Sequence, residues 1–89
     1  MPETISPAIC KAARALVGLT QPQLAEKARV AKSTIANFET ALSVPNAKNM
    51  ADIIAALEAA GVEFVEENGG GPGVRLRKKL EKSPRGRQS

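Results

Sequence analysis

Apolar residues recur at intervals of three and four through three stretches of the chain, which is the spacing of amphipathic helices. The first stretch, residues 6–18, opens with Ser6 and Pro7, a strong helix-start signal, and stops at a glycine. The second, residues 20–40, reads as two short helices joined by a tight turn. The third, residues 46–61, has the pattern of one long helix with an asparagine N-cap. The pattern therefore predicts four helices before residue 62.

From residue 62 the pattern changes to alternation, which is typical of strands. A glycine-rich run at residues 68–73 separates this segment from a second alternating one at 74–77, so we expect a β-hairpin with acidic residues facing arginines. The ribbon carries more apolar surface than one side of it can hide, and its exposed edge invites pairing with a second copy. The residues expected at this homodimer interface are Val62, Phe64, Val65, Val74 and Leu76.

The stretch at residues 20–40 holds the candidate chemistry. Thr20 is placed to cap the first helix of the pair, and the second helix is expected to begin near Ala31 or Lys32. One face of that second helix has no large apolar residue and carries short donors and acceptors, a combination that suits the reading of base edges in a major groove. Those side chains are Lys32, Ser33, Thr34 and Asn37. Helix pairs without any nucleic-acid role are also common, so spacing alone leaves both interpretations open.

Composition excludes several other functions. The only aromatic residues are Phe38 and Phe64, so the stacking platforms of single-stranded nucleic-acid binders are missing. With no histidine and a single cysteine, Cys10, the chain lacks the usual metal-ligand sets and nucleophile–base pairs. We therefore expect no enzyme activity and no cofactor. The lone cysteine and the absence of a secretory signal or long apolar run favour a cytoplasmic protein with no membrane partner, and DNA binding would make it nucleoid-associated.

The net charge of +4 is mainly a property of the C-terminal tail. Residues 1–61 carry a net charge of +1, residues 62–73 carry −3 and residues 74–89 carry +6. A basic terminal run favours phosphate partners, although many such runs are merely solvated. Lys48 lies in the first turn of the long helix, where a cation opposes the helix dipole, so it faces either a phosphate or solvent.

The motif residues of the 20–40 stretch resemble the Xre/Cro-like, or phage-repressor-like, helix-turn-helix family of small bacterial and phage DNA-binding regulators. The likeness runs from about Ile9 to about Leu57. The residues that carry it are Gln21, Leu24, Ala25, Val30, Ser33, Thr34, Ile35 and Glu39.

The resemblance implies roles for individual residues. The position of Gln21 is one that contacts a DNA phosphate in the family, and Arg14 and Glu39 occupy positions that often form an ion pair. Gln23, in the same first turn as Gln21, and Lys48 complete the phosphate contacts that we expect. The positions that face bases in the family are those of Ala31, Lys32, Ser33 and Asn37.

Two departures from the family pattern concern turn geometry. The turn between the paired helices commonly holds glycine, but Arg29 stands here, and Ala31 replaces the usual Ser or Thr cap. After Glu39, where glycine is also common, the chain has Thr40 and Ala41. A residue other than glycine in a left-handed conformation costs on the order of 1 kcal/mol, so we expect the turns to form without being optimal.

The combined prediction is a mainly α, repressor-like four-helix domain with a C-terminal two-stranded β-hairpin. We expect a helix-turn-helix DNA-binding domain at residues 1–61, a dimerisation hairpin at 62–77 and a flexible basic tail at 78–89. The expected function is sequence-specific binding of double-stranded DNA by a dimeric transcriptional regulator, most simply a repressor on an inverted-repeat operator. The alternative is an antitoxin or antiactivator that binds a protein, in which case Leu42, Val44 and the hairpin would matter more than Lys32 and Asn37.

Overall fold

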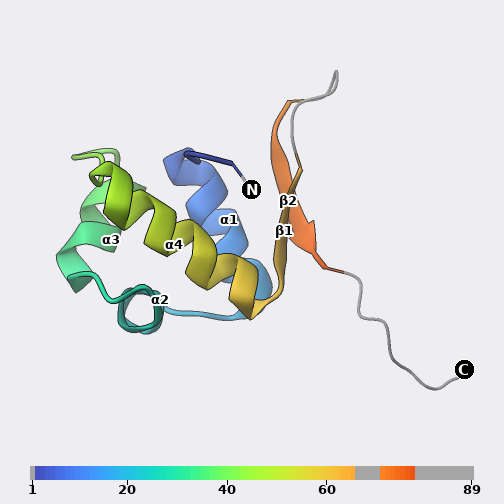
Figure 1. The fold of residues 1–89 in the computed structure, drawn as a ribbon, viewed down its shortest axis with the longest axis horizontal. Coiled ribbons are helices and arrows are strands. Elements are labelled where there is room, and N and C mark those ends of the chain that lie inside the picture. The colour runs from blue at the N-terminus through green and yellow to red at the C-terminus, as the bar shows by residue number, and fades with distance from the viewer. Residues whose placement is uncertain (1, 66–70, 78–89) are drawn as a thin grey trace, which may run out of the picture.

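Four helices and one hairpin follow each other along the chain (Figure 1). The computed structural model describes residues 2–65 and 71–77. Within them, the elements are α1 (Pro7–Val17), α2 (Gln21–Ala28), α3 (Lys32–Glu39), α4 (Ala47–Ala60), β1 (Val62–Val65) and β2 (Gly73–Leu76). The predicted fold class, mainly helical with a C-terminal two-stranded hairpin, is confirmed. The basic tail expected at residues 78–89 lies outside the described residues.

Side-chain caps fix where three of the helices begin. Ser6 Oγ accepts a hydrogen bond from the backbone N–H of Ile9 at 3.1 Å, and Asn46 Oδ1 accepts one from the N–H of Asn49 at 2.7 Å. Thr20 caps α2 as part of a reciprocal capping box. Helix α3, in contrast, starts after Ala31 with no side-chain cap. The Ala31 methyl group cannot accept a hydrogen bond, and the Thr34 N–H is bonded to the Ala31 carbonyl at 2.9 Å instead.

The turns on either side of α3 contain residues other than glycine in the left-handed region. Arg29 has φ 60° and Ala41 has φ 63°. They are the positions at which the family commonly has glycine, and the chain adopts the left-handed turns there without it. The left-handed backbone crowds a Cβ against the following carbonyl, which costs about 1–2 kcal/mol per residue.

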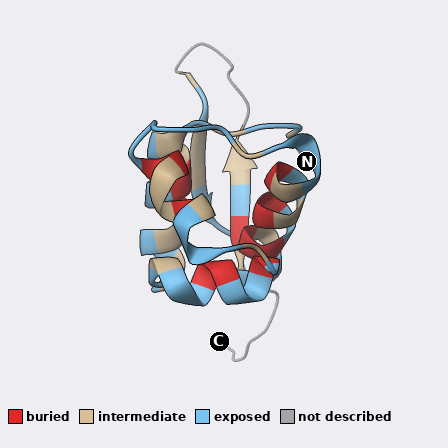
Figure 2. Ribbon diagram, turned by 90° about the vertical axis from the view of Figure 1, so that its left-hand side faces the viewer, coloured by how far each residue is buried: buried red, intermediate tan, exposed pale blue. Residues whose placement is uncertain are grey.

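The core lies between α2, α3, α4 and the inner side of α1 (Figure 2). Small residues on α2, Ala25 and Ala28, let this helix pack closely against both α3 and α4. Aliphatic side chains and one phenylalanine fill the centre, as the composition requires. The largest fully buried side chains are Phe38, Leu24, Ile35, Ile53, Ile54, Leu57, Val62 and Cys10.

The hairpin is antiparallel and packs on the helical core through β2 against α1 and β1 against α4. Val62 pairs with Leu76, and Phe64 pairs with Val74. Val62 is only 1% exposed and belongs to the molecule's own core, which corrects the expectation that it lies at a dimer interface. Its burial follows from its place directly after α4, where the first strand residue is drawn into the helical core. Phe64 and Val74 are partly buried against the same core, while Leu76 is 54% exposed.

Candidate nucleic-acid interface

Helix α3 has one buried side and one side that is exposed or partly exposed. Ile35, Phe38 and Glu39 are buried, so they fix the helix against the rest of the domain. The opposite side holds the polar row expected from the sequence, with Lys32 and Ser33 exposed and Thr34 and Asn37 partly exposed. Ala31, directly before the helix, is also exposed.

The polar row is free to bind another molecule. Within the part of the chain that the structure describes, the side chains of Lys32, Ser33, Thr34 and Asn37 make no hydrogen bond. Asn37 instead uses its backbone carbonyl, which accepts from Leu42 N at 2.7 Å and from Ser43 N at 3.2 Å and so closes the turn after α3. An amide, two hydroxyls and an ammonium group are therefore available on the side of α3 that faces away from the core.

At the start of α2, more hydrogen-bonding groups are already used within the protein than the sequence suggests. Thr20 Oγ1 accepts from Gln23 N at 3.2 Å, and Gln23 Oε1 accepts in return from Thr20 N at 2.9 Å. The Leu24 N–H is bonded to Thr20 O, and Pro22 has no N–H to offer. Two donors there make no hydrogen bond within the described chain: the side-chain Nε2 of Gln23 and the backbone N–H of Gln21. Among the backbone amides in the first turn of α2, the one at Gln21 is thus left without a hydrogen bond in the described chain.

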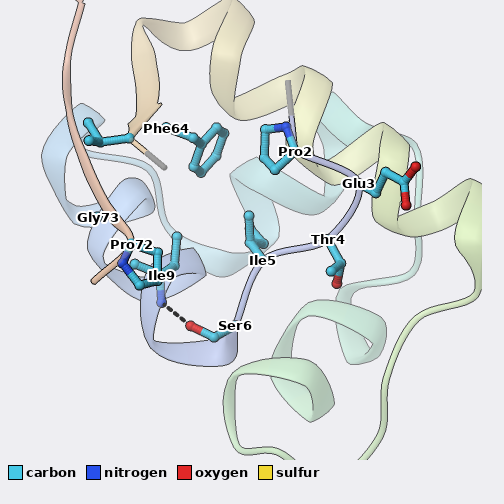
Figure 3. Close-up of a pocket in the computed structure, with 10 residues that line it drawn as sticks. Pro2, Glu3, Thr4, Ile5, Ser6, Ile9, Phe64, Pro72 and Gly73 are labelled. Atoms are coloured by element: carbon cyan, nitrogen blue, oxygen red, sulfur yellow. Dashed lines mark hydrogen bonds between the residues drawn. The ribbon is translucent and has the colours of Figure 1, made fainter. Parts of the chain in front are cut away.

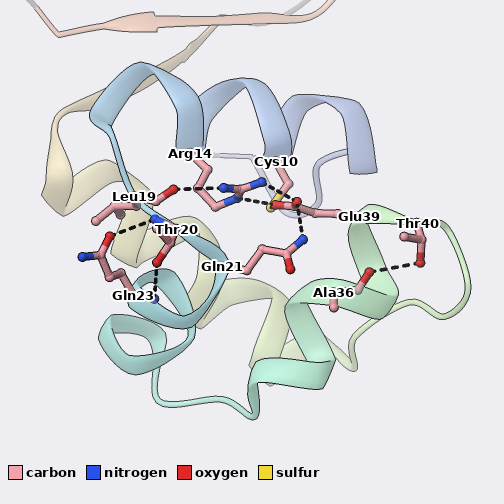
Figure 4. Close-up of polar contacts among 9 residues, drawn as sticks. All are labelled: Cys10, Arg14, Leu19, Thr20, Gln21, Gln23, Ala36, Glu39 and Thr40. Carbon is pink, nitrogen blue, oxygen red and sulfur yellow. Dashed lines mark hydrogen bonds and ion pairs between the residues drawn. The ribbon is translucent and has the colours of Figure 1, made fainter.

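A buried polar cluster joins α1, α2 and α3 (Figure 4). The Glu39 carboxylate accepts from Arg14 Nε at 2.9 Å and from Arg14 Nη2 at 2.8 Å, so the pair expected from the resemblance is bidentate. Arg14 Nη1 also donates to the Leu19 carbonyl at 3.0 Å. Two further donors reach the same carboxylate: Gln21 Nε2 at 2.9 Å and Cys10 Sγ at 3.3 Å. Sequence spacing gave no signal for these last two contacts.

The cluster keeps its carboxylate ionised. Burial by itself would raise the pKa of the Glu39 carboxyl, but the hydrogen bonds from the guanidinium, the amide and the thiol outweigh it and hold that pKa below its ordinary value. The hydrogen bonding between Arg14 and Glu39 also raises the pKa of Arg14 above its ordinary value. Burial, with a smaller contribution from the neighbouring carboxylate, raises the pKa of the Cys10 thiol to about 12. Cys10 is therefore a buried hydrogen-bond donor in the thiol form.

Lys48, expected near a phosphate, pairs with a residue of its own helix. Its Nζ lies 2.8 Å from Asp52 Oδ2, and the lysine side chain is 82% exposed. Exposed pairs one helical turn apart contribute only a few tenths of a kcal/mol, so this contact would not prevent Lys48 from turning to an anion.

A hollow of about 640 Å³ lies elsewhere, between the N-terminal segment and the hairpin (Figure 3). Its wall is mostly apolar. The side chains that line it include Pro2, Ile5, Ile9, Phe64 and Pro72. In Figure 1 the hairpin and α3 lie at opposite ends of the molecule, so this hollow is no part of the polar surface on α3.

Comparison with known proteins bears on the same region. No curated protein matches the chain significantly. In the described part of the chain, no helix is long and apolar enough to cross a membrane. A protein-family model described as helix-turn-helix, HTH_3, matches residues 11–64, a span that contains all four helices but the start of α1, together with most of β1. This match, over more than half of the chain, shows that the protein belongs to the family of Xre/Cro-like helix-turn-helix DNA-binding regulators.

Proposed function

We propose that the protein is a sequence-specific repressor of transcription that binds double-stranded DNA as a dimer, with α3 in the major groove. The observation that carries this proposal is the division of α3 into a buried face and a polar face without hydrogen-bond partners in the described chain. A polar outward face is ordinary on a surface helix, and what favours DNA here is that α3 is the second helix of the matched helix-turn-helix pair. Recognition helices of this motif use such a row to contact base edges.

Each group on the row suits a particular base contact. Lys32 is matched to the O6 and N7 acceptors of guanine, and the Asn37 amide is matched to N6 and N7 of adenine. Ser33 and Thr34 can donate to or accept from either kind of pair, and the Ala31 methyl suits contact with a thymine methyl.

Phosphate contacts would set the position of α3 without carrying sequence information. Gln21 is the leading candidate for a phosphate contact, and the side-chain Nε2 of Gln23, in the same first turn of α2, is a second. Lys48, at the start of α4, is exposed enough to reach a phosphate by leaving Asp52. The basic tail at residues 78–89 would add affinity that does not depend on sequence and that falls as salt is raised.

We propose the domain organisation in the same terms: residues 1–61 bind DNA, residues 62–77 dimerise and residues 78–89 contact the DNA backbone. The exposed Leu76 on the strand β2 supports the second assignment, together with the partly exposed Phe64, Val65 and Val74. A two-fold dimer would place two recognition helices about 34 Å apart in successive major grooves, so the operator would be an inverted repeat. The protein would act in the cytoplasm, at the nucleoid.

Sedimentation equilibrium tests the dimer with a matched pair of variants. Leu76 and Leu42 are both exposed leucines, at 54% and 75%, at the hairpin and in the loop after α3 respectively. Leu76→Lys should convert the dimer to a monomer at micromolar concentration, and Leu42→Lys should leave it dimeric. The reverse result would place the interface at the loop, and a monomeric parent would exclude both.

An electrophoretic mobility shift with duplex DNA from upstream of the protein's own gene tests the central proposal. A discrete complex should survive an excess of unrelated duplex. A complex that the unrelated duplex removes at equal concentration would contradict sequence-specific binding.

One observation favours a second candidate function, the binding of a protein partner. Leu42 and Val44 are 75% and 77% exposed in the loop between α3 and α4, next to a second hollow lined by Val44, Pro45 and Met50. An antitoxin or antiactivator would use such a surface. Leu42→Lys would then abolish the biological effect while leaving any mobility shift unchanged, which separates the two functions.

A further inference from the structure

The buried carboxylate of Glu39 lies directly behind the proposed backbone anchor, Gln21. Gln21 Nε2 donates to Glu39 Oε1 at 2.9 Å, and Figure 4 shows the amide reaching from the start of α2 to the end of α3. A carboxylate can only accept hydrogen bonds, so it turns the NH₂ end of the amide toward itself and the oxygen away. The amide of Gln21 therefore has one orientation instead of two.

The carboxylate that imposes this orientation is itself fixed. Arg14 binds it through two nitrogens, at 2.9 and 2.8 Å, and the planar guanidinium sets the plane of the carboxylate as well as its position. Arg14 is held in turn by the Leu19 carbonyl, just before the Thr20 cap of α2. The contacts therefore run from Gln21 on α2 to Glu39 on α3, from Glu39 to Arg14 on α1, and from Arg14 to the carbonyl in the loop before α2.

Few other donors remain at this end of α2. The capping box uses Thr20 N and Gln23 N, and the Leu24 N–H is bonded within the helix. What Gln21 offers is its backbone N–H and the second hydrogen on Nε2, since the first is directed at Glu39. Both belong to one residue that is partly exposed, so a phosphate bound here would be sensitive to how that side chain is oriented.

We propose that Glu39, fixed by Arg14, is a positioning residue for DNA binding: it orients the Gln21 amide so that its second hydrogen is presented to a DNA phosphate. The inference rests on the proposed function. The Gln21 contact helps to stabilise the buried carboxylate, and under the proposal the same contact also sets the direction of the second amide hydrogen of Gln21.

The test uses full-length protein and a duplex selected from a random pool by the parent protein. A set of duplexes is then made in which one phosphate at a time is replaced by a neutral methylphosphonate. For the parent, neutralising the phosphate at α2 should weaken binding roughly tenfold or more, the size expected for a hydrogen bond to a charged group. Gln21→Ala keeps the backbone N–H, so it should lose most of this response at that phosphate and keep the responses at the others.

Glu39→Met should behave like Gln21→Ala at that one phosphate, with the ratio of affinities for unmodified and modified duplex falling well below that of the parent. A purely structural role would lower the active fraction equally for all duplexes and leave every ratio unchanged, which would overturn the proposal. It would also be overturned if Gln21→Ala altered no phosphate response. Failure of the parent protein to select any duplex would instead refute the proposed function itself.

A measurement on the unmodified protein covers the case in which Glu39→Met does not fold. The side-chain NH₂ groups of Gln21 and Gln23 can be compared by NMR hydrogen exchange, since both lie in the first turn of α2. The Gln21 group, bonded to Glu39, should exchange more slowly than the Gln23 group, whose nitrogen has no partner in the described chain. Equal exchange would mean that Gln21 is not held, and would overturn the proposal.

Discussion

Two Glu–Arg pairs in this molecule have similar shortest distances and very different surroundings. In the helical motif, Arg14 and Glu39 approach to 2.8 Å, and the Glu39 side chain is 1% exposed. On the hairpin, Arg75 and Glu63 approach to 3.1 Å with 65% and 45% of their side chains exposed. In both pairs the arginine lowers the pKa of the carboxyl. The shortest distance and the direction of the pKa shift are therefore alike, while solvent exposure and the second arginine–carboxylate hydrogen bond distinguish the two pairs.

The two settings imply different roles. Arg75 and Glu63 are exposed, so water solvates either partner when the other is removed. The pair therefore contributes little to the free energy of unfolding. In the motif, the Glu39 carboxylate is shielded from solvent, so its charge is stabilised by hydrogen bonds from Arg14, Gln21 and Cys10. We expect the motif end of the molecule to be sensitive to single substitutions and the hairpin end to tolerate them.

The largest expected effect comes from leaving one charge of the buried pair alone. Arg14→Met should lower the free energy of unfolding by about 3–5 kcal/mol, because the Glu39 carboxylate stays buried without its main partner. Urea denaturation followed by circular dichroism measures the change. The control is Arg75→Met on the hairpin, for which no measurable change is expected. Equal losses in the two variants would remove the distinction between the pairs.

DNA binding should show the same contrast between the two ends. Lys32→Ala or Asn37→Ala should each cost roughly 1–3 kcal/mol at the preferred site, with a smaller effect on random duplex, because base contacts are lost. Arg75→Ala removes a hairpin charge and should change specific and random binding by the same factor. If Lys32→Ala and Asn37→Ala weakened both kinds of DNA equally, these side chains would not be base readers.

The pH dependence of stability should also separate the two carboxylates. Glu39 has a folded-state pKa below its unfolded value of about 4.3, so its stabilising contribution is complete above that pH and is lost as the pH falls through the folded-state pKa. The difference in unfolding free energy between the parent and Glu39→Gln should therefore shrink as the pH is lowered from 7 to 3. Glu63→Gln should stay close to the parent at every pH. A Glu39→Gln difference that is independent of pH would contradict an ionised buried carboxylate.

The contrast between the two ends also marks where sequence reasoning succeeds. Local signals placed the elements well: Ser6 and Asn46 cap helices as expected, and Gly18 and Gly61 follow the helix ends in left-handed conformation. The polar row on α3 could be found from periodicity because a helix repeats its faces at fixed intervals. The family likeness supplied the pairing of Arg14 with Glu39.

Contacts between residues distant in sequence were not accessible in the same way. The Gln21 and Cys10 contacts with Glu39 span 18 and 29 positions, and they depend on how three helices cross. Val62 was assigned to an interface because alternation shows which residues share a face of a ribbon, and not which face the helices cover. Composition and spacing describe each element by itself. The two missed contacts and the wrong assignment of Val62 all concern the packing of one element on another.

The smallest effect that we expect concerns the turns, which again differ between the two ends. At the hairpin end, positive φ falls on Gly61 and Gly71, while around α3 it falls on Arg29 and Ala41. Replacing Arg29 or Ala41 by glycine relieves a left-handed Cβ, worth about 1–2 kcal/mol, but increases the entropy of the unfolded chain, which costs about 0.4–1 kcal/mol. Each variant should therefore be more stable than the parent by roughly 0.5–1 kcal/mol.

A neighbouring substitution controls for flexibility alone. Thr40 has φ −93° and its hydroxyl donates to the Ala36 carbonyl at 3.0 Å, so Thr40→Gly relieves no strain and removes a hydrogen bond. It should lower the melting temperature, whereas Ala41→Gly should raise it. If Ala41→Gly also lowered it, the left-handed turn after α3 would carry no strain for glycine to relieve, and the two ends of the molecule would not differ in how their turns are made.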